Sequence, residues 1–185
     1  MLTIELIAHV DAGDRRLWQR DQDERPISEL GREQARRFAD LLGSARVDLL
    51  VSSPALRCRQ TIEPLAERFA LPIEALPGLH ETEGFAPGPG WGRRHAPPEA
   101  YGATHAAGLA FAALLDLRRR LPQGRAVACS YGDVVPAFAS FFSAAYGLSL
   151  PEPPFRPIWY TLEFDGDAVG GRLNQSPADF PGRAP

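Results

Sequence analysis

Three short polar clusters each follow an apolar run, and they contain the residues best suited to chemistry. His9 follows the run at 2–8, the segment 52–54 ends a second run, and 130–133 ends a third. A histidine can act as a nucleophile, or as a general acid or base near neutral pH. A lone histidine after an apolar strand more often has a structural role, so the interpretation of His9 depends on its neighbours.

Arg57 is the neighbour that changes this interpretation. It stands at the start of a predicted helix in the stretch SSPALRCRQT, where the first backbone N–H groups of the helix favour an anion. Its guanidinium can bind a phosphate or carboxylate group with two parallel hydrogen bonds. Arg59, two residues later, is expected to lie in solvent. The sequence therefore predicts an anion site near His9.

Short apolar strands alternate with helices along the chain. This order predicts an α/β fold, a three-layer α/β/α sandwich with a mainly parallel central sheet. Ligands of such sheets collect beyond the carboxyl ends of the strands, where the three polar clusters converge. One domain is predicted over 1–175, with a long loop at 77–98 over the site and a loosely ordered C-terminal tail at 176–185. The expected strands are 2–8, 47–51, 71–74, 125–130 and 159–164, and the expected helices are 29–42, 56–69, 99–120 and 134–146.

Composition and charge argue against several classes of function. The net charge of −3 disfavours nucleic-acid binding, and no apolar run approaches the roughly 20 residues that span a bilayer. We expect a cytoplasmic protein whose two cysteines, Cys58 and Cys129, are reduced. The four histidines have no spacing typical of metal ligands, so neither a metal nor another cofactor is predicted. All 20 basic residues are arginine, so any anion must be bound by guanidinium or backbone N–H groups.

Five segments of the chain carry a resemblance to a known family. They are LIAHVDAGDR, RPISELGREQARRFADLL, SSPALRCRQTIEPLAERF, LHETEG and ACSYGDVV. These segments resemble the histidine phosphatase superfamily, which implies the phosphoglycerate-mutase-like fold. Within that superfamily, the chain looks most like the small phosphohistidine phosphatases and the phosphatase-like domain joined to some Nudix hydrolases.

The resemblance implies a role for particular residues. His9 corresponds to the nucleophile that accepts the phosphoryl group, and Arg57 to the arginine that binds the phosphate. Glu81 corresponds to the proton donor for the leaving oxygen, although Glu83 is close enough in sequence to take that role instead. Arg15 falls where many members have a further phosphate-binding residue. The remaining residues expected to bind substrate are Ser130, Tyr131 and Gly132.

Two positions depart from the pattern that the family has around the phosphate. Ala8 replaces the arginine of its Arg-His-Gly motif, and Tyr131 replaces the histidine of its Ser-His-Gly-Asp motif. Loss of one preorganised donor typically lowers a rate by about 10²–10³-fold, so two such losses predict weak activity. Compensation would need Arg15, Arg16 or Arg59 to occupy the vacant space.

Three functions are consistent with these residues, and we favour the first. The first is a diverged phosphatase with weak activity on a phosphohistidine, a phosphomonoester or a nucleotide. The second is a pseudophosphatase that binds a phosphorylated or acidic ligand without turnover. The third is non-phosphatase chemistry, with His9 and Glu81 as base and acid and Tyr131 as an oxyanion donor. The expected partner is a phosphorylated small molecule or a phosphoprotein, with no nucleic acid and no membrane, and the sequence predicts no oligomeric state.

Overall fold

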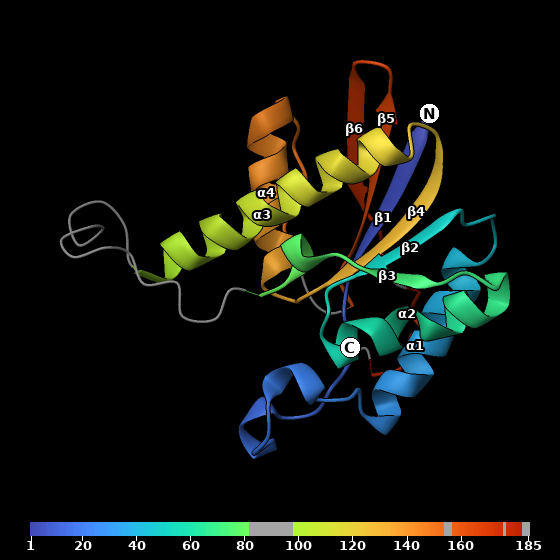
Figure 1. Cartoon of the computed structure of the whole chain (residues 1–185), viewed down its shortest axis with the longest axis vertical. Helices are drawn as coiled ribbons and strands as arrows, with labels where there is room; N and C mark the ends of the chain where they lie inside the picture. The colour runs from blue at the N-terminus through green and yellow to red at the C-terminus, as the bar shows by residue number, and fades with distance from the viewer. Residues whose placement is uncertain (82–97, 154–156, 176, 183–185) are drawn as a thin grey trace.

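The computed structural model describes residues 1–81, 98–153, 157–175 and 177–182. In this part of the chain, six strands form one sheet in the order β3-β2-β4-β1-β5-β6 (Figure 1). The strands are β1 (Leu2–Ala8), β2 (Leu49–Ser52), β3 (Ile73–Ala75), β4 (Gly124–Ser130), β5 (Trp159–Asp165) and β6 (Ala168–Leu173). The helices are α1 (Glu29–Leu42), α2 (Leu56–Phe69), α3 (Pro98–Arg120) and α4 (Val134–Tyr146), with short 3-10 helices η1 (Arg15–Leu17), η2 (Gln22–Glu24) and η3 (Pro77–Leu79).

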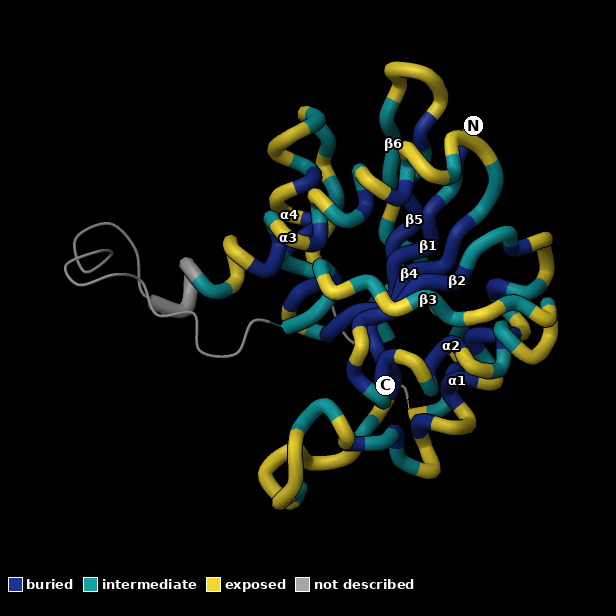
Figure 2. Tube along the Cα trace, viewed as in Figure 1, coloured by how far each residue is buried: buried dark blue, intermediate teal, exposed yellow. Residues whose placement is uncertain are grey.

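The sheet is mainly parallel, as predicted. The pairs β1–β4, β2–β4 and β2–β3 are parallel, and β1–β5 and β5–β6 are antiparallel. Right-handed crossovers in this strand order place α1 and α2 on one face of the sheet and α3 and α4 on the other (Figure 1). The three-layer α/β/α arrangement is therefore confirmed. The central strands β1 and β4 are buried along most of their length because helices cover both faces (Figure 2).

The last strand, β6, was not predicted from the sequence. It pairs with β5 through a tight turn at 165–168, in which Gly166 has a positive φ of 58°. Gly170 and Gly171 lie inside β6, and glycines weaken the pattern by which a strand is recognised. The predicted end of the sheet at residue 164 is therefore wrong.

The C-terminal segment 177–182 is packed on α1, which contradicts the prediction of a loosely ordered tail. Phe180 is buried, with its ring 5.2 Å from that of Phe38. Asp179 lies 2.9 Å from the guanidinium of Arg37, and the carbonyl of Pro181 accepts a hydrogen bond from Gln34. A single phenylalanine among prolines has no periodicity, so the sequence does not show that it has a site in the core.

The predicted covering loop lies outside the described residues from 82 to 97, and Glu83 lies outside them with it. The described residues 77–81 of this stretch form η3 and the segment that carries His80 and Glu81. None of the helices in the described part of the chain combines the length and the apolar character that crossing a membrane requires.

Candidate active site

The end of β1 places His9 at the carboxyl edge of the sheet. Its backbone N–H donates to the Ser130 carbonyl of β4 over 2.8 Å, which continues the parallel pairing of the two strands. Its ring Nδ1 lies 2.7 Å from the Val10 carbonyl oxygen. Because a carbonyl can only accept, Nδ1 carries the proton in this contact. The neutral ring then has its lone pair on Nε2, which is the atom able to attack phosphorus.

The residue after His9 is held by α2. The Val10 N–H donates to Thr61 Oγ1 over 3.2 Å, and that hydroxyl donates to the Arg57 carbonyl over 2.7 Å. In the described part of the chain, Ala70 is the one non-glycine residue with a positive φ. Val10 therefore follows His9 without left-handed strain, and its backbone is tied to the helix that carries Arg57.

The start of α1 fixes the loop that follows His9. Ser28 caps the helix by accepting from the Gly31 N–H over 3.0 Å, and its own N–H donates to the Asp11 carbonyl over 3.0 Å. The Asp11 N–H donates to Gln34 Oε1 over 2.8 Å. Helix and loop approach so closely that a Cβ on Gly31 would lie 2.1 Å from the Asp11 carbonyl oxygen. Gly31 and Gln34 thus set the position of the loop through its backbone.

We expect Gly31→Ala to destabilise the protein and to lower any activity that depends on His9. The new methyl group must displace a backbone carbonyl, which should lower the free energy of unfolding by about 1–3 kcal/mol. Gly108→Ala is a matched control, because a Cβ there meets no atom within 4 Å. That change in α3 should stabilise the protein by about 0.4–1 kcal/mol. Urea unfolding measures both variants, and equal stability of the two would contradict the close packing at Gly31.

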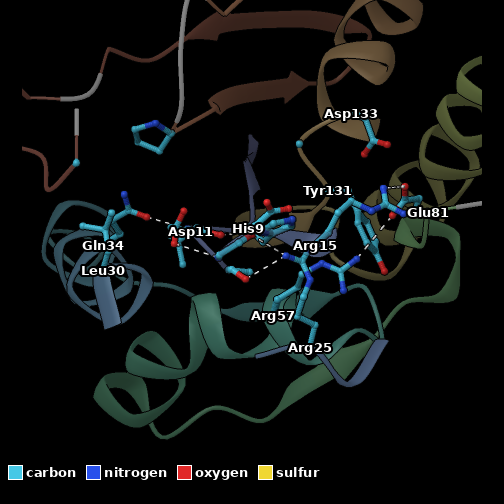
Figure 3. Close-up of a pocket in the computed structure, with 17 residues that line it drawn as sticks. His9, Asp11, Arg15, Arg25, Leu30, Gln34, Arg57, Glu81, Tyr131 and Asp133 are labelled. Carbon is cyan, nitrogen blue, oxygen red and sulfur yellow. Dashed lines mark hydrogen bonds and ion pairs between the residues drawn. The ribbon is translucent and has the colours of Figure 1, made fainter. Parts of the chain in front are cut away.

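A cavity of about 480 Å³ lies beside His9. Figure 3 shows Arg15, Arg25 and Arg57 grouped on one side of His9. Most of the residues that the sequence predicted for the site line this cavity: His9, Arg15, Arg57, Glu81, Tyr131 and Gly132. Ser130 does not line it, contrary to the prediction, because it is fully buried and its hydroxyl donates to the Leu79 carbonyl over 2.7 Å.

Arg57 lies in the first turn of α2, as predicted, and it is almost completely buried. Its guanidinium lies 4.6 Å from the centroid of the Tyr131 ring, a distance typical of a cation–π contact. Nη1 donates to the Gln22 carbonyl, and Nη2 lies 3.6 Å from the Glu81 carboxylate. Its buried Nε has no hydrogen-bond partner in the described structure. A buried guanidinium with an unused donor is suited to an anion.

Arg25 also lines the cavity, and the sequence did not identify it as a site residue. It lies between η2 and α1, is only 7% exposed, and donates through Nη1 to the carbonyls of Ala12 and Gly13, each over 3.0 Å. Its buried Nε also has no hydrogen-bond partner in the described structure. Burial lowers the pKa of Arg25, and the charges of Arg57 and Arg15 lower it further. An arginine nevertheless stays charged at neutral pH, so Arg25 adds a second buried positive charge to the cavity.

Glu81 follows η3 and faces the arginines. Its carboxylate lies 3.6 Å from Arg57 and 3.9 Å from Arg15. Burial raises the pKa of Glu81 and the neighbouring Asp133 raises it further, while the two arginines act in the opposite direction. A carboxyl group with a raised pKa keeps its proton closer to neutral pH, which suits a general acid.

The two cysteines, Cys58 and Cys129, are free, buried thiols that do not line the cavity. The thiols of Cys58 and Cys129 approach the same carbonyl, that of Ser130, at 3.5 and 3.9 Å. Burial raises the pKa of Cys129 well above its usual value, so this thiol is a poor nucleophile at neutral pH. Within the described residues there is no group of three or more His, Cys, Asp or Glu side chains that could hold a metal ion.

Comparison with known families identifies the class of protein. The family model for the histidine phosphatase superfamily (branch 1) matches residues 10–107, which is more than half of the chain. The chain belongs to the histidine phosphatase superfamily. It is 31% identical over 140 residues to an 8-oxo-(d)GTP phosphatase of Mycolicibacterium smegmatis. That alignment covers 76% of this chain and 37% of the relative, so the chain spans little more than a third of the length of the relative.

Solved structures show the same fold. The protein histidine phosphatase SixA in complex with tungstate is 20% identical, with a TM-score of 0.63 and 94% of each chain covered. YhfR of Bacillus stearothermophilus is 18% identical, with a TM-score of 0.67 and coverage of 92% of this chain and 95% of that one. A mycobacterial glucosyl-3-phosphoglycerate phosphatase is 22% identical, with a TM-score of 0.67 and coverage of 93% and 96%. The phosphoglycerate-mutase-like fold is therefore confirmed for this chain.

Tyr131 stands where the resembled motif has a second histidine, and its hydroxyl is held by protein groups. Ser53 donates to that hydroxyl over 3.3 Å, and the hydroxyl donates to Asp23 over 3.5 Å. Burial raises the pKa of Tyr131, so the side chain is neutral. Its ring lies edge-on to that of His9 at 6.0 Å. Tyr131 packs against His9 and Arg57, and its hydroxyl already donates to Asp23, which disfavours its predicted role as an oxyanion donor.

Ala8 stands where the resembled motif has an arginine, and Arg15, Arg16 and Arg59 are the residues considered as compensation for it. Ala8 is buried and does not line the cavity. Of the three arginines expected to compensate, Arg15 reaches the cavity, whereas Arg16 pairs with an exposed aspartate and Arg59 is exposed. The additional buried guanidinium comes instead from Arg25.

Proposed function

We propose that this member of the histidine phosphatase superfamily is a diverged phosphohydrolase that works through a phosphorylated His9. Its substrates are a phosphohistidine, a phosphomonoester or a nucleotide. One observation carries the proposal: His9 shares a single cavity with Arg15, Arg25, Arg57 and Glu81. A nucleophile, three positive charges and a proton donor are the components that phosphoryl transfer to a side chain requires.

The proposed reaction has two steps. In the first, Nε2 of His9 attacks the phosphorus, the bond from phosphorus to the leaving oxygen breaks, and that oxygen takes the proton of Glu81. In the second, a water molecule attacks the phosphorus and gives a proton to Glu81. The phosphorus–nitrogen bond then breaks, which releases phosphate and restores His9. A covalent intermediate of this kind divides one difficult displacement into two easier ones.

The arginines supply the electrostatic part of catalysis. Phosphoryl transfer spreads negative charge over three equatorial oxygens, and stabilising that charge accounts for most of the rate enhancement. Arg25 and Arg57 bring buried charge with an unused Nε donor each, and the more exposed Arg15 can follow the phosphate as it moves. We expect activity to survive because Arg25 compensates for Ala8, and to be weak because Tyr131 carries no charge.

The cavity is suited to a compact phosphorylated group. Its volume of about 480 Å³ lies within the roughly 300–1,000 Å³ typical of small-molecule sites. Similar proteins include a protein histidine phosphatase, a glucosyl-3-phosphoglycerate phosphatase and an 8-oxo-(d)GTP phosphatase. These activities support a phosphorylated small molecule or a phosphoprotein side chain as the substrate of this chain.

A pseudophosphatase is the second candidate, and one feature of the site favours it. Tyr131 replaces a histidine by a neutral group, and Nη1 of Arg57 is already committed to the Gln22 carbonyl. A site of this kind could bind phosphate without completing its transfer. The two candidates differ in whether His9 ever carries a phosphoryl group.

Trapping a phosphorylated His9 distinguishes the phosphohydrolase from the pseudophosphatase. The wild-type chain is mixed with an aryl phosphate, quenched in alkali, which preserves phosphohistidine, and digested for mass spectrometry. We expect phosphate on the peptide that contains His9, and none on the same peptide of His9→Ala. If no phosphorylated peptide forms while the wild-type chain still binds inorganic phosphate, the chain is a pseudophosphatase and the proposal fails.

A further inference from the structure

Asp133 is an acidic residue on the cavity wall that the proposed reaction does not use. It is the N-cap of α4, where one carboxylate oxygen accepts from the Val134 N–H over 3.0 Å. It lines the same cavity as Glu81, and Figure 3 shows both carboxyl groups on the side of the cavity where Tyr131 lies. The two side chains are in hydrogen-bond contact with each other.

This contact determines how many protons the pair holds. Two carboxyl groups can form a hydrogen bond only when one of them carries a proton, because a carboxylate has no donor. Two negative charges in hydrogen-bond contact also repel each other, which disfavours ionisation of both groups. The other charged groups that face Glu81 are Arg15 of η1, at 3.9 Å, Arg57 of α2, at 3.6 Å, and Arg25 on the same cavity wall. All three arginines favour the charged form of Glu81, so Asp133 acts against them.

The position of the proton within the pair follows from the helix. Asp133 lies at the N-terminus of α4, a helix of 13 residues, where the unpaired N–H groups and the helix dipole stabilise a negative charge. Glu81 follows η3 in an irregular segment and does not itself cap a helix. The negative charge of the pair is therefore more stable on Asp133, and the proton is more stable on Glu81.

We propose that Asp133 is a positioning residue that keeps the shared proton on Glu81 and holds that carboxyl group toward the leaving oxygen. This role rests on the proposed function, because it makes Asp133 the residue that keeps Glu81 protonated as the acid of that reaction. When the leaving oxygen takes the proton, Glu81 becomes a carboxylate beside Arg15 and Arg57, and Asp133 remains charged on its helix. The proton that the attacking water later gives to Glu81 restores the pair.

Asp133→Asn tests the inference, because asparagine also caps helices but carries no charge. The rate falls as pH rises through the pKa of Glu81, since only the protonated form donates. Removing the neighbouring charge lets Glu81 ionise at lower pH. On phenyl phosphate, whose leaving oxygen needs a proton, the alkaline limb of the plot of kcat/KM against pH should therefore shift to lower pH by about one unit. At any pH on that limb, kcat/KM of Asp133→Asn should be about 10-fold lower than that of the wild type.

A second substrate separates this role from a structural one. With 2,4-dinitrophenyl phosphate, whose leaving oxygen departs without a proton, Asp133→Asn and the wild type should have the same rate. Asp116→Asn, on the exposed face of α3, should leave both profiles unchanged. Asp133→Ser keeps a capping oxygen without the charge, so it should reproduce the shift even if the asparagine variant folds poorly.

Two results would overturn the inference while leaving the proposed function intact. One is that Asp133→Asn turns over phenyl phosphate and its kcat/KM falls at the same alkaline pH as that of the wild type. The other is an equal loss of rate on both substrates, which would make Asp133 a purely structural cap. Absence of turnover by the wild-type chain on either substrate would overturn the proposed function together with the inference.

Discussion

Replacing His9 by alanine should lower the turnover of an aryl phosphate by about 10⁴-fold or more, the scale on which loss of a nucleophile acts within a catalytic unit. Alanine has no atom that can accept the phosphoryl group, so the two-step route is closed. Arg15, Arg25 and Arg57 remain in place, and they should still bind phosphate because the cavity keeps its charge. The expected signature is therefore a fall in kcat with little change in the affinity for inorganic phosphate.

His105→Ala is the matched control for this experiment. His105 lies in α3, is exposed and is not among the residues that line the cavity, so its replacement should leave the rate unchanged. Steady-state kinetics on both variants, with calorimetry for phosphate binding, gives the comparison. Equal rates for the wild type and His9→Ala would show that the measured hydrolysis does not use this histidine.

The parts of the fold that follow local rules were predictable from the sequence. Helix α2 begins after Pro54-Ala55, helix α4 begins at the Asp133 cap and ends at Gly147, and both have the predicted bounds. Caps, glycines and apolar periodicity act over a few residues, so the sequence shows them directly. The strand β6 was harder to recognise because Gly170 and Gly171 interrupt its pattern. The packing of Phe180 depends on a partner distant in sequence, Phe38. No local pattern identifies such partners.

The candidate site also contains residues that the sequence could predict and residues that it could not. His9, Arg57 and Glu81 are recognisable because they stand in motifs that resemble those of a family, and the structure brings all three to one cavity. Arg25 precedes Pro26, so the local sequence around it indicates only a helix boundary. Its place in the cavity depends on the path of residues 11–24, which folds back so that Arg25 reaches the carbonyls of Ala12 and Gly13. Sequence alone does not specify the path of such a loop.

Arg25→Gln should lower kcat/KM by about 10²–10³-fold, the usual effect of removing one preorganised donor from a charged transition state. Glutamine keeps a polar side chain with an N–H donor at this position, while the charge is lost. If Arg25 compensates for the arginine absent at position 8, its removal should affect catalysis more than stability. Kinetics and urea unfolding of the same variant measure the two effects separately.

Arg59→Gln is the matched control for Arg25→Gln, because Arg59 is an exposed arginine of α2 close in sequence to Arg57. It should leave kcat/KM unchanged, which would show that position, and not the number of arginines, determines the rate. Arg25 and Arg57 face the same cavity, and the charge of Arg57 lowers the pKa of Arg25, so the effects of replacing them should not add. We expect the double variant Arg25→Gln, Arg57→Gln to lose less than the product of the single losses. Full additivity would mean that the two arginines act on different groups, and the proposal of one shared phosphate site would then be wrong.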